Sequence, residues 1–276
     1  IGVGLIGGSI GFALKSKSKN KKSRIRIIGI GRNIGRLKIA KKLGAVDEIT
    51  TDIKKGVKDA GVIFVCLPVG MIAETVKKIF PFCKKGAVVT DVGSVKEPIV
   101  REVEKFLPPI PYPLSPAFVG GHPIAGSEKT SAKNASENLF KNAPVILTPA
   151  KRTDKRPVKI IRKLWETAGA RVYVMPASAH DDILSFSSHL PHVVAFSLVN
   201  TVRDLRFAGS GFRDTTRIAA SSPEMWADII FHNRANVKKA IRKFKNELTK
   251  IENVKTEKEL AGILRIAKLK RDKCWR

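Results

Sequence analysis

The first 175 residues alternate short apolar runs with segments in which apolar residues recur at helical spacing. Short runs rich in β-branched residues predict strands, and strands that alternate with helices predict a doubly wound, mostly parallel sheet of the α/β class. Helical patterns lie between the runs, for example at 71–79 and 155–168. The predicted strands are 24–29, 62–66, 87–91, 145–148 and 171–174.

From about Pro176 the β-branched runs stop and the helical pattern continues, with predicted helices at 192–206, 223–251 and 257–270. Ser222 precedes Pro223 and Glu224, which favours a helix start because serine caps free amide groups and proline suits the first turn. We therefore predict two domains. The predicted domains are an α/β domain over residues 1–175, with an irregular proline-rich surface loop at 108–116, and an all-α domain over residues 176–276.

The composition is that of a globular protein, with 43% hydrophobic and 28% charged residues. The longest apolar stretch, 62–73, contains Pro68 and is too short to span a bilayer, so we expect no membrane association. Three widely spaced cysteines form neither a disulfide framework nor a metal cluster, and we expect a reducing cytoplasm. The chain begins at Ile1 without a methionine, so we expect that most of a first strand precedes it.

The charge is strongly basic: 52 Lys and Arg against 24 Asp and Glu give a formal net charge of +28. Nucleic-acid binding through phosphate neutralisation is one interpretation. The basic residues are spread along the chain, however, and the sparse aromatic residues do not interleave with them, so platforms for stacking bases are lacking. We favour solvated basic faces and a field that steers small anions, and we expect no specific nucleic-acid partner.

A glycine-rich segment opens the chain. Residues 2–8 read GVGLIGG and match the dinucleotide-binding pattern G-x-G-x-x-G. In that pattern the first glycine allows a tight turn, the second lets a pyrophosphate approach, and the third lets the helix pack on the strand. A helical pattern and then a strand follow, which favours a dinucleotide site over an ordinary glycine turn. The predicted cofactor-binding residues are Gly2, Gly4, Leu5, Ile6, Gly7, Arg32 and Pro68.

The end of the second strand bears on which dinucleotide is bound. Enzymes that use NAD usually place an acid there to bond the ribose 2′-hydroxyl. This chain reads Ile30-Gly31-Arg32-Asn33, without a carboxylate. Because an arginine can pair with a 2′-phosphate, we expect NADP rather than NAD. NAD as the cofactor, with Arg32 as a solvated loop residue, stays open.

Two further segments carry candidate chemistry. Residues 91–96, DVGSVK, end a predicted strand at the sheet edge where α/β proteins bind ligands, and Ser94 with Glu97 spells a capping box. Residues 120–128, GGHPIAGSE, place His122 in what we predict to be a tight glycine-rich loop. A histidine there is a candidate acid or base, although a loop histidine alone is more often a surface residue.

Five segments occur in order: GVGLIGGSIG, DVGSVK, GGHPIAGSEK, SSHLPHVVAF and GFRDTTRIAASSPEMW. Together, over nearly the whole chain, they resemble the prephenate dehydrogenases of the TyrA family. The resemblance implies a Rossmann-type domain followed by a helical dimerisation domain, and therefore a homodimer. It also implies oxidation of prephenate by NAD(P)+ to 4-hydroxyphenylpyruvate and carbon dioxide, in tyrosine biosynthesis. Some members prefer arogenate and yield tyrosine.

The same resemblance implies residue roles. His122 matches the catalytic histidine, which bonds the ring 4-hydroxyl and takes its proton as hydride leaves. Ser94 matches a serine that helps to hold that hydroxyl and the histidine. The positions that match substrate-binding residues or acids near the site entrance are His192, Arg217, Arg213, Glu128 and Asp214.

Substrate charge supports these roles, because prephenate is a dianion. Arg217 can grip a carboxylate with two hydrogen bonds, and Arg213 is its i,i+4 neighbour if that segment is helical. We expect His192 in the first turn of a helix opened by Pro191, where amide dipoles favour an anion. We predict no metal, because His189 and His192 lack further ligands at suitable spacing. His189 is expected at a helix start or domain junction.

Nothing after the helical segment resembles an added regulatory domain, so a monofunctional enzyme is expected. Another two-domain dehydrogenase, acting on a β-hydroxy acid, is the alternative enzyme class, although such enzymes lack the GGHPIAG and SHLPH pair. Prephenate and arogenate differ only in a keto acid or amino acid side chain, and no single residue of the sequence separates them.

Overall fold

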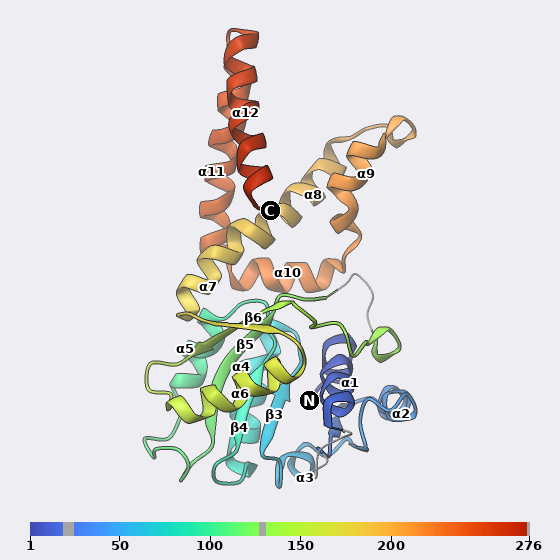
Figure 1. Cartoon of the computed structure of the whole chain (residues 1–276), viewed down its shortest axis with the longest axis vertical. Helices are drawn as coiled ribbons and strands as arrows, with labels where there is room; N and C mark the ends of the chain where they lie inside the picture. The colour runs from blue at the N-terminus through green and yellow to red at the C-terminus, as the bar shows by residue number, and fades with distance from the viewer. Residues whose placement is uncertain (19–24, 127–130, 275–276) are drawn as a thin grey trace.

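The computed structural model describes residues 1–18, 25–126 and 131–274 (Figure 1). Its larger sheet has five strands in the order β3-β4-β5-β6-β7, and a two-stranded parallel sheet pairs β1 with β2. All neighbouring strands run parallel except β5 and β6, which are antiparallel. The strands are β1 (Ile28–Ile30), β2 (Glu48–Thr50), β3 (Val62–Val65), β4 (Val88–Asp91), β5 (Ala117–Pro123), β6 (Pro144–Pro149) and β7 (Arg171–Val174).

The first two residues of the chain lie between the two sheets. The Gly2 amide donates to the Ile30 carbonyl of β1 at 2.8 Å, and the Cys66 amide after β3 donates to the Ile1 carbonyl at 2.7 Å. Strand order therefore reads β2, β1, residues 1–2, β3, β4 and β5. This is the doubly wound order, in which dinucleotides bind where the order reverses.

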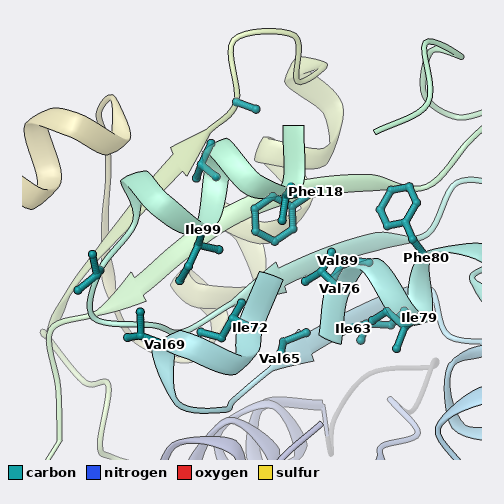
Figure 2. Close-up of a cluster of buried hydrophobic side chains, with 14 of the residues drawn as sticks. Ile63, Val65, Val69, Ile72, Val76, Ile79, Phe80, Val89, Ile99 and Phe118 are labelled. Carbon is teal, nitrogen blue, oxygen red and sulfur yellow. The ribbon is translucent and has the colours of Figure 1, made fainter. Parts of the chain in front are cut away.

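Helices cover both faces of the larger sheet. Successive strand residues point to opposite faces, so Val88 and Val89 of β4 enter different apolar clusters. On one face α4 and α5 contribute buried residues such as Ile72 and Ile99, which Figure 2 shows gathered against β3, β4 and β5. On the other face α1 and α6 contribute residues such as Trp165. The helices of this region are α1 (Leu5–Ser18), α2 (Ile34–Lys42), α3 (Ile53–Val57), α4 (Val69–Ile79), α5 (Glu97–Glu104) and α6 (Lys155–Thr167).

The rest of the described chain is helical. A long hairpin of α11 and α12 projects away from the sheets in Figure 1. No helix in the described ranges is long and apolar enough to cross a membrane. The helices are α7 (Ala177–Leu184), α8 (Leu190–Thr201), α9 (Ser210–Thr216), α10 (Pro223–His232), α11 (Arg234–Glu252) and α12 (Glu257–Cys274), with a π-helical turn at Ser185–His189 and 3-10 turns at Leu205–Phe207 and Arg217–Ala220.

The predicted α/β class is confirmed, but two strands were not predicted. β2 has only three residues and begins with a charged residue, so it lacks an apolar run. β5 reads AFVGGHP, with two glycines and a single β-branched residue, so it lacks the composition that is typical of a strand. A Cβ at Gly120 would lie 2.4 Å from the Thr148 hydroxyl oxygen of β6, so the glycine allows the two strands to pair closely.

Two helix predictions also need correction. The helix predicted over 223–251 is broken at Asn233, whose φ and ψ are −109° and 23°. The Asn233 side-chain amide donates to the Asp181 carbonyl at 2.8 Å, which ties this break to α7. The helix predicted over 192–206 ends at Thr201.

The cap predicted at Ser222 is confirmed, because its hydroxyl accepts from the Met225 amide. The loop at 108–116 is irregular, as predicted.

Candidate active site

The predicted cofactor and catalytic residues follow the ends of parallel strands. Arg32 follows β1, Pro68 follows β3, Ser94 follows β4, and His122 is the penultimate residue of β5. Carboxyl ends of parallel strands meet at one edge of a sheet, which is where open α/β sheets bind ligands. The helical region covers this edge, since the Gly70 amide at the start of α4 donates to Asp228 of α10 at 3.2 Å. The site therefore lies at the junction of the two regions.

The glycine turn has the shape that a pyrophosphate needs. Gly2 has φ of +85°, and a Cβ there would lie 2.2 Å from the Cys66 carbonyl oxygen. A Cβ at Gly7 would lie 2.3 Å from the Gly2 carbonyl oxygen, so only glycine lets α1 pack against the turn. A Cβ at Gly4 would meet nothing within 4 Å. Leu5 and Ile6 form the first turn of α1, where amide groups lack partners within the helix and can bind phosphate. These features fit a dinucleotide.

The loop after β1 offers a cation and no carboxylate. Arg32 is exposed, and no acid among the described residues pairs with it. Asn33 caps α2 by accepting from the Arg36 amide at 3.0 Å, which fixes the loop. The exposed guanidinium is therefore the charged group that residues 31–33 of this loop offer.

His122 is a buried strand residue, which corrects the expectation of a tight loop. It pairs with Ile146 of the antiparallel strand β6, and only 9% of it is exposed. The glycines before it, Gly120 and Gly121, serve close strand packing instead of a turn; a Cβ at Gly121 would lie 2.9 Å from the Asp91 carbonyl oxygen. Burial lowers the pKa of His122 well below its ordinary value, and the adjacent His180 and Lys96 lower it further.

A chain of hydrogen bonds leads from His122 into the helical region. His122 Nδ1 lies 2.8 Å from His180 Nε2, and His180 Nδ1 lies 2.7 Å from Asp181 Oδ1. Both Asp181 oxygens also accept backbone N–H groups at the start of α5, from Lys96 at 2.7 Å and Glu97 at 2.8 Å. Burial lowers the pKa of His180, even though the Asp181 carboxylate opposes this shift. Both rings are therefore neutral at pH 7.

Asp181 also replaces the cap that the sequence predicted. The structure starts α5 at Glu97 with Lys96 as its N-cap, and no side-chain cap comes from Ser94. The predicted capping box of Ser94 and Glu97 is therefore wrong, because a carboxylate distant in sequence already takes the free amides. Ser94 is half-buried after β4, and in the described part of the chain no hydrogen bond joins it to His122.

A buried ion pair holds the ends of β4 and β5 together. The Lys96 ammonium contacts the Asp91 carboxylate and donates to the Gly121 carbonyl at 3.0 Å. Asp91 in turn accepts the Gly93 amide at 2.9 Å and the Gly121 amide at 3.1 Å. Burial lowers the pKa of the Lys96 ammonium, and Asp91 opposes that shift. This network fixes the backbone on either side of His122.

His192 is the predicted substrate residue of α8, in the helical region. Its Nδ1 donates to the Ser188 carbonyl at 3.0 Å, and its ring stacks on Trp226 with centroids 3.4 Å apart. Burial lowers the pKa of His192, and the nearby charge of Arg217 lowers it further. His192 lies in the first turn of α8 with Pro191, as predicted, but this is no free helix start. The chain runs helically from α7 through the π-turn into α8, so the expected anion-binding amides are absent there.

The remaining predicted substrate residues have different positions. Arg213 and Asp214 are exposed on α9, and Arg217, also exposed, begins the 3-10 turn that follows α9 directly. The segment is therefore helical, which is the condition under which Arg213 and Arg217 were expected to be neighbours. Glu128 lies outside the described residues. His189 ends the π-helical turn directly before α8, which was one of its two expected places. Its Nδ1 lies 3.1 Å from the Asn233 amide, and burial lowers its pKa to about 4.

Sequence reasoning missed several residues of this site. Lys96 and Trp226 stand in the segments DVGSVK and GFRDTTRIAASSPEMW without a predicted role, and the other three belong to none of the five segments. All of them meet the histidines of the site only through the tertiary fold. For two of them the adjacent histidine and aspartate just after β7 were an available signal, since an adjacent acid can hold an imidazole tautomer. The residues are Lys96, His180, Asp181, Trp226 and Asn233.

Comparisons with known proteins cover both regions. Residues 12–174 match the family described as prephenate dehydrogenase, nucleotide-binding domain, and residues 176–268 match prephenate dehydrogenase, dimerization domain. The chain is 36% identical to a prephenate dehydrogenase of Bacillus subtilis, over 98% of this chain and 73% of the relative. It is 31% identical to a cyclohexadienyl dehydrogenase of Zymomonas mobilis, over 91% of this chain and 85% of the relative.

Two solved structures share the whole architecture. A prephenate dehydrogenase from A. aeolicus, solved in complex with hydroxyphenyl propionate and NAD+, superposes with a TM-score of 0.89 at 37% identity, over 99% of this chain and 96% of that one. An arogenate dehydrogenase from Synechocystis gives a TM-score of 0.81 at 30% identity, over 99% of this chain and 97% of that one.

Proposed function

The chain belongs to the prephenate dehydrogenase family, and from that premise we propose that it oxidises prephenate with NAD(P)+. The products are 4-hydroxyphenylpyruvate, carbon dioxide and the reduced dinucleotide. The observation that carries this proposal is the neutral, buried imidazole of His122 at the sheet edge that also holds the glycine turn.

His122 acts as the general base. One ring nitrogen, Nδ1, is engaged by His180, so Nε2 is the atom available to the substrate. As hydride leaves C4 of the ring, the hydroxyl on that carbon gives its proton to Nε2 and becomes a carbonyl. Loss of the ring carboxylate as carbon dioxide then supplies the electron pair that completes the aromatic ring, and the phenolate oxygen formed in this step takes the proton back from Nε2. The dinucleotide, when bound, supplies the hydride acceptor.

The helical region binds the substrate carboxylates. Prephenate is a dianion; the charge of Arg217 acts on His192, and Arg213 lies four residues before Arg217 in the same helical segment, so we propose that both arginines bind the substrate. An exposed guanidinium beside a half-buried imidazole can form charge-assisted hydrogen bonds to a carboxylate. Ser94, which lies at the same edge as His122, is proposed to contact the ring hydroxyl. Glu128 and Asp214 are proposed at the entrance.

The finer properties of the enzyme follow from the same residues. We propose NADP+ as the preferred cofactor, because Arg32 can pair with a 2′-phosphate and no acid occupies the loop. We propose a homodimer formed through the helical domain, with the domains divided at 1–175 and 176–276. The thiols of Cys66 and Cys83 are free, in line with a cytoplasmic location.

Arogenate is the second candidate substrate. The relatives named for cyclohexadienyl and arogenate substrates favour it, since each matches more than nine-tenths of this chain. Arogenate differs from prephenate at the side chain remote from the reacting carbon. The same base and hydride transfer would therefore act on it, and the product would be tyrosine.

A kinetic matrix tests the proposal. Prephenate and arogenate are each assayed with NAD+ and with NADP+, and the reduced dinucleotide is followed at its near-ultraviolet absorbance. We expect turnover with prephenate, faster with NADP+ than with NAD+. A higher kcat/KM for arogenate would assign the second candidate, and absence of turnover in all four combinations would refute the proposed reaction.

A further inference from the structure

We propose that His180 is a positioning residue that, together with Asp181, holds His122 in the tautomer with a proton on Nδ1 and a free lone pair on Nε2. For its effect on rate this inference rests on the proposed function. The tautomer itself is a property of the folded chain. His180 belongs to α7 of the helical region and His122 to β5, so the two domains would share the catalytic base.

The direction of each hydrogen bond follows from Asp181. Its two oxygens accept backbone N–H groups from Lys96 and Glu97, and an ionised carboxylate held in this way can only accept. The 2.7 Å contact between Asp181 Oδ1 and His180 Nδ1 therefore has the proton on His180 Nδ1. A neutral imidazole carries one N–H, which leaves His180 Nε2 as an acceptor.

The acceptor at His180 Nε2 determines the proton position on His122. His180 Nε2 lies 2.8 Å from His122 Nδ1, so the proton of this contact belongs to His122. With its single proton on Nδ1, a neutral His122 has an unprotonated Nε2, which is the form that a base needs. Burial keeps both rings neutral by lowering their pKa values. Lys96 lowers both pKa values further and His189 lowers that of His122, whereas Asp181 and Asp91 oppose the shift at His180.

The surroundings of His180 fix its position from several elements. The ring and the Asp181 carboxylate are almost fully buried, at 0% and 1% exposed. Asn233, at the break between α10 and α11, donates to the Asp181 carbonyl. When His122 takes the substrate proton it becomes a cation, and its Nδ1–H still points to His180. The cation is then stabilised by the Asp181 carboxylate through one intervening ring.

Imidazole nitrogen NMR measures the tautomer directly, without turnover. The full chain is labelled with ¹⁵N-histidine and studied at pH 7.5. The five histidines are assigned by single substitutions, of which His122→Asn identifies the signal at issue. We expect a protonated Nδ1 and an unprotonated Nε2 at His122. A protonated Nε2 would overturn the proposal, whatever the enzyme's substrate is.

Two variants of His180 separate positioning from general packing. His180→Gln can place an amide oxygen near the position of Nε2 and so keep an acceptor for His122, whereas His180→Leu removes it. We expect His180→Leu to lower kcat about 100-fold, with KM and dinucleotide affinity nearly unchanged, since loss of a general base costs about 10²- to 10⁴-fold. His180→Gln should recover about 10-fold. Equal rates for Leu and Gln, or wild-type kcat in His180→Leu, would refute the positioning role.

The substitution Asp181→Asn is expected to favour the opposite tautomer of both histidines. An amide N–H facing His180 Nδ1 would reverse the proton on both rings and leave His122 protonated on Nε2. We expect the NMR signature of His122 to invert and kcat to fall. Should the variant fold poorly, since α5 loses part of its cap, the tautomer measured in the wild-type chain still decides the question.

Discussion

His122 is the residue on which the proposed chemistry depends most directly. Its imidazole is buried at the end of β5, and its Nδ1 is held by His180. The sequence identified this histidine through its motif but placed it in a loop. Burial changes the chemical conclusion, because a buried imidazole stays neutral at pH 7 and can act as a base without first losing a proton.

Replacing His122 by Asn tests its role at the residue scale. Asparagine is small enough for the buried site but cannot accept a proton at neutral pH. We expect kcat to fall by about 10²- to 10⁴-fold, the range for loss of a general base. Dinucleotide affinity, measured by fluorescence titration, should change less than about twofold. Wild-type turnover in this variant would remove His122 from the mechanism.

Arg32 offers a second test at the same scale. If its guanidinium pairs with a 2′-phosphate, Arg32→Ala should lower kcat/KM for NADP+ about 10- to 100-fold, since a hydrogen bond to a charged group contributes about 1.5–3 kcal/mol. The value for NAD+ should stay within about twofold. Lys38→Ala, an exposed residue of the adjacent helix α2, is the matched control. A parallel loss for both dinucleotides would contradict NADP+ selection.

Among the elements, the turn between residue 2 and α1 contains one glycine that the fold requires and one that ligand binding is expected to require. Gly4 borders open space, whereas a Cβ at Gly7 would lie 2.3 Å from a backbone oxygen. The two glycines therefore belong to one motif but have different physical reasons to be glycine.

Alanine substitutions in this turn should behave differently. Gly4→Ala is expected to keep the unfolding midpoint in urea while it weakens dinucleotide binding at least about 10-fold, because the methyl group occupies the pyrophosphate approach. Gly7→Ala should lower the free energy of unfolding by about 1–3 kcal/mol, the usual cost of overpacking. If Gly4→Ala bound dinucleotide as tightly as the wild type, the pyrophosphate would not approach at Gly4.

At the scale of the whole molecule, the helical hairpin of α11 and α12 projects away from the sheets (Figure 1), and it carries apolar side chains that nothing in the described part of the chain covers. No residue of α12 is buried among those whose side chains the structure describes. The exposed apolar residues of the hairpin are Leu248, Ile251, Leu264, Ile266 and Leu269, at 41–58% exposure. Large exposed apolar faces mark interaction surfaces, so we expect this hairpin to be covered in the proposed homodimer.

Light scattering after gel filtration should therefore give twice the mass of one chain. The double variant Leu264→Asp, Leu269→Asp should shift the protein toward the monomer, because it places carboxylates in the covered face. Lys258→Asp, at an exposed position of the same helix, should leave the mass unchanged. A monomeric wild type, or a double variant that stays dimeric, would contradict this interface.

Buried histidines should make the whole fold sensitive to mild acid. Burial lowers the pKa of His189 from 6.5 to about 4, so between those values the unfolded chain binds a proton that the folded chain does not. The free energy of unfolding must then fall as the pH falls, by about 3 kcal/mol from His189 over the full window. Lowered pKa values of His122 and His180 act in the same direction.

Urea unfolding at pH 7 and pH 5 measures this dependence. The wild type should lose stability between the two, and His189→Gln should lose about 2 kcal/mol less, because the titrating group is gone. Stability that changes equally with pH in both proteins would show that His189 does not bind a proton on unfolding.

The sequence by itself determined the α/β class, the glycine turn, most strands and the identity of the candidate base, because these depend on local patterns of apolar residues and on short motifs. It could not determine β5 as a strand, the break at Asn233 or the cap of α5. Each of these depends on a partner far along the chain: Thr148 for Gly120, and Asp181 for both Asn233 and the amide groups of α5. Only the tertiary structure placed His180 against His122, and hydrogen-bond direction and pKa values are set by such contacts and by burial, not by neighbours in sequence.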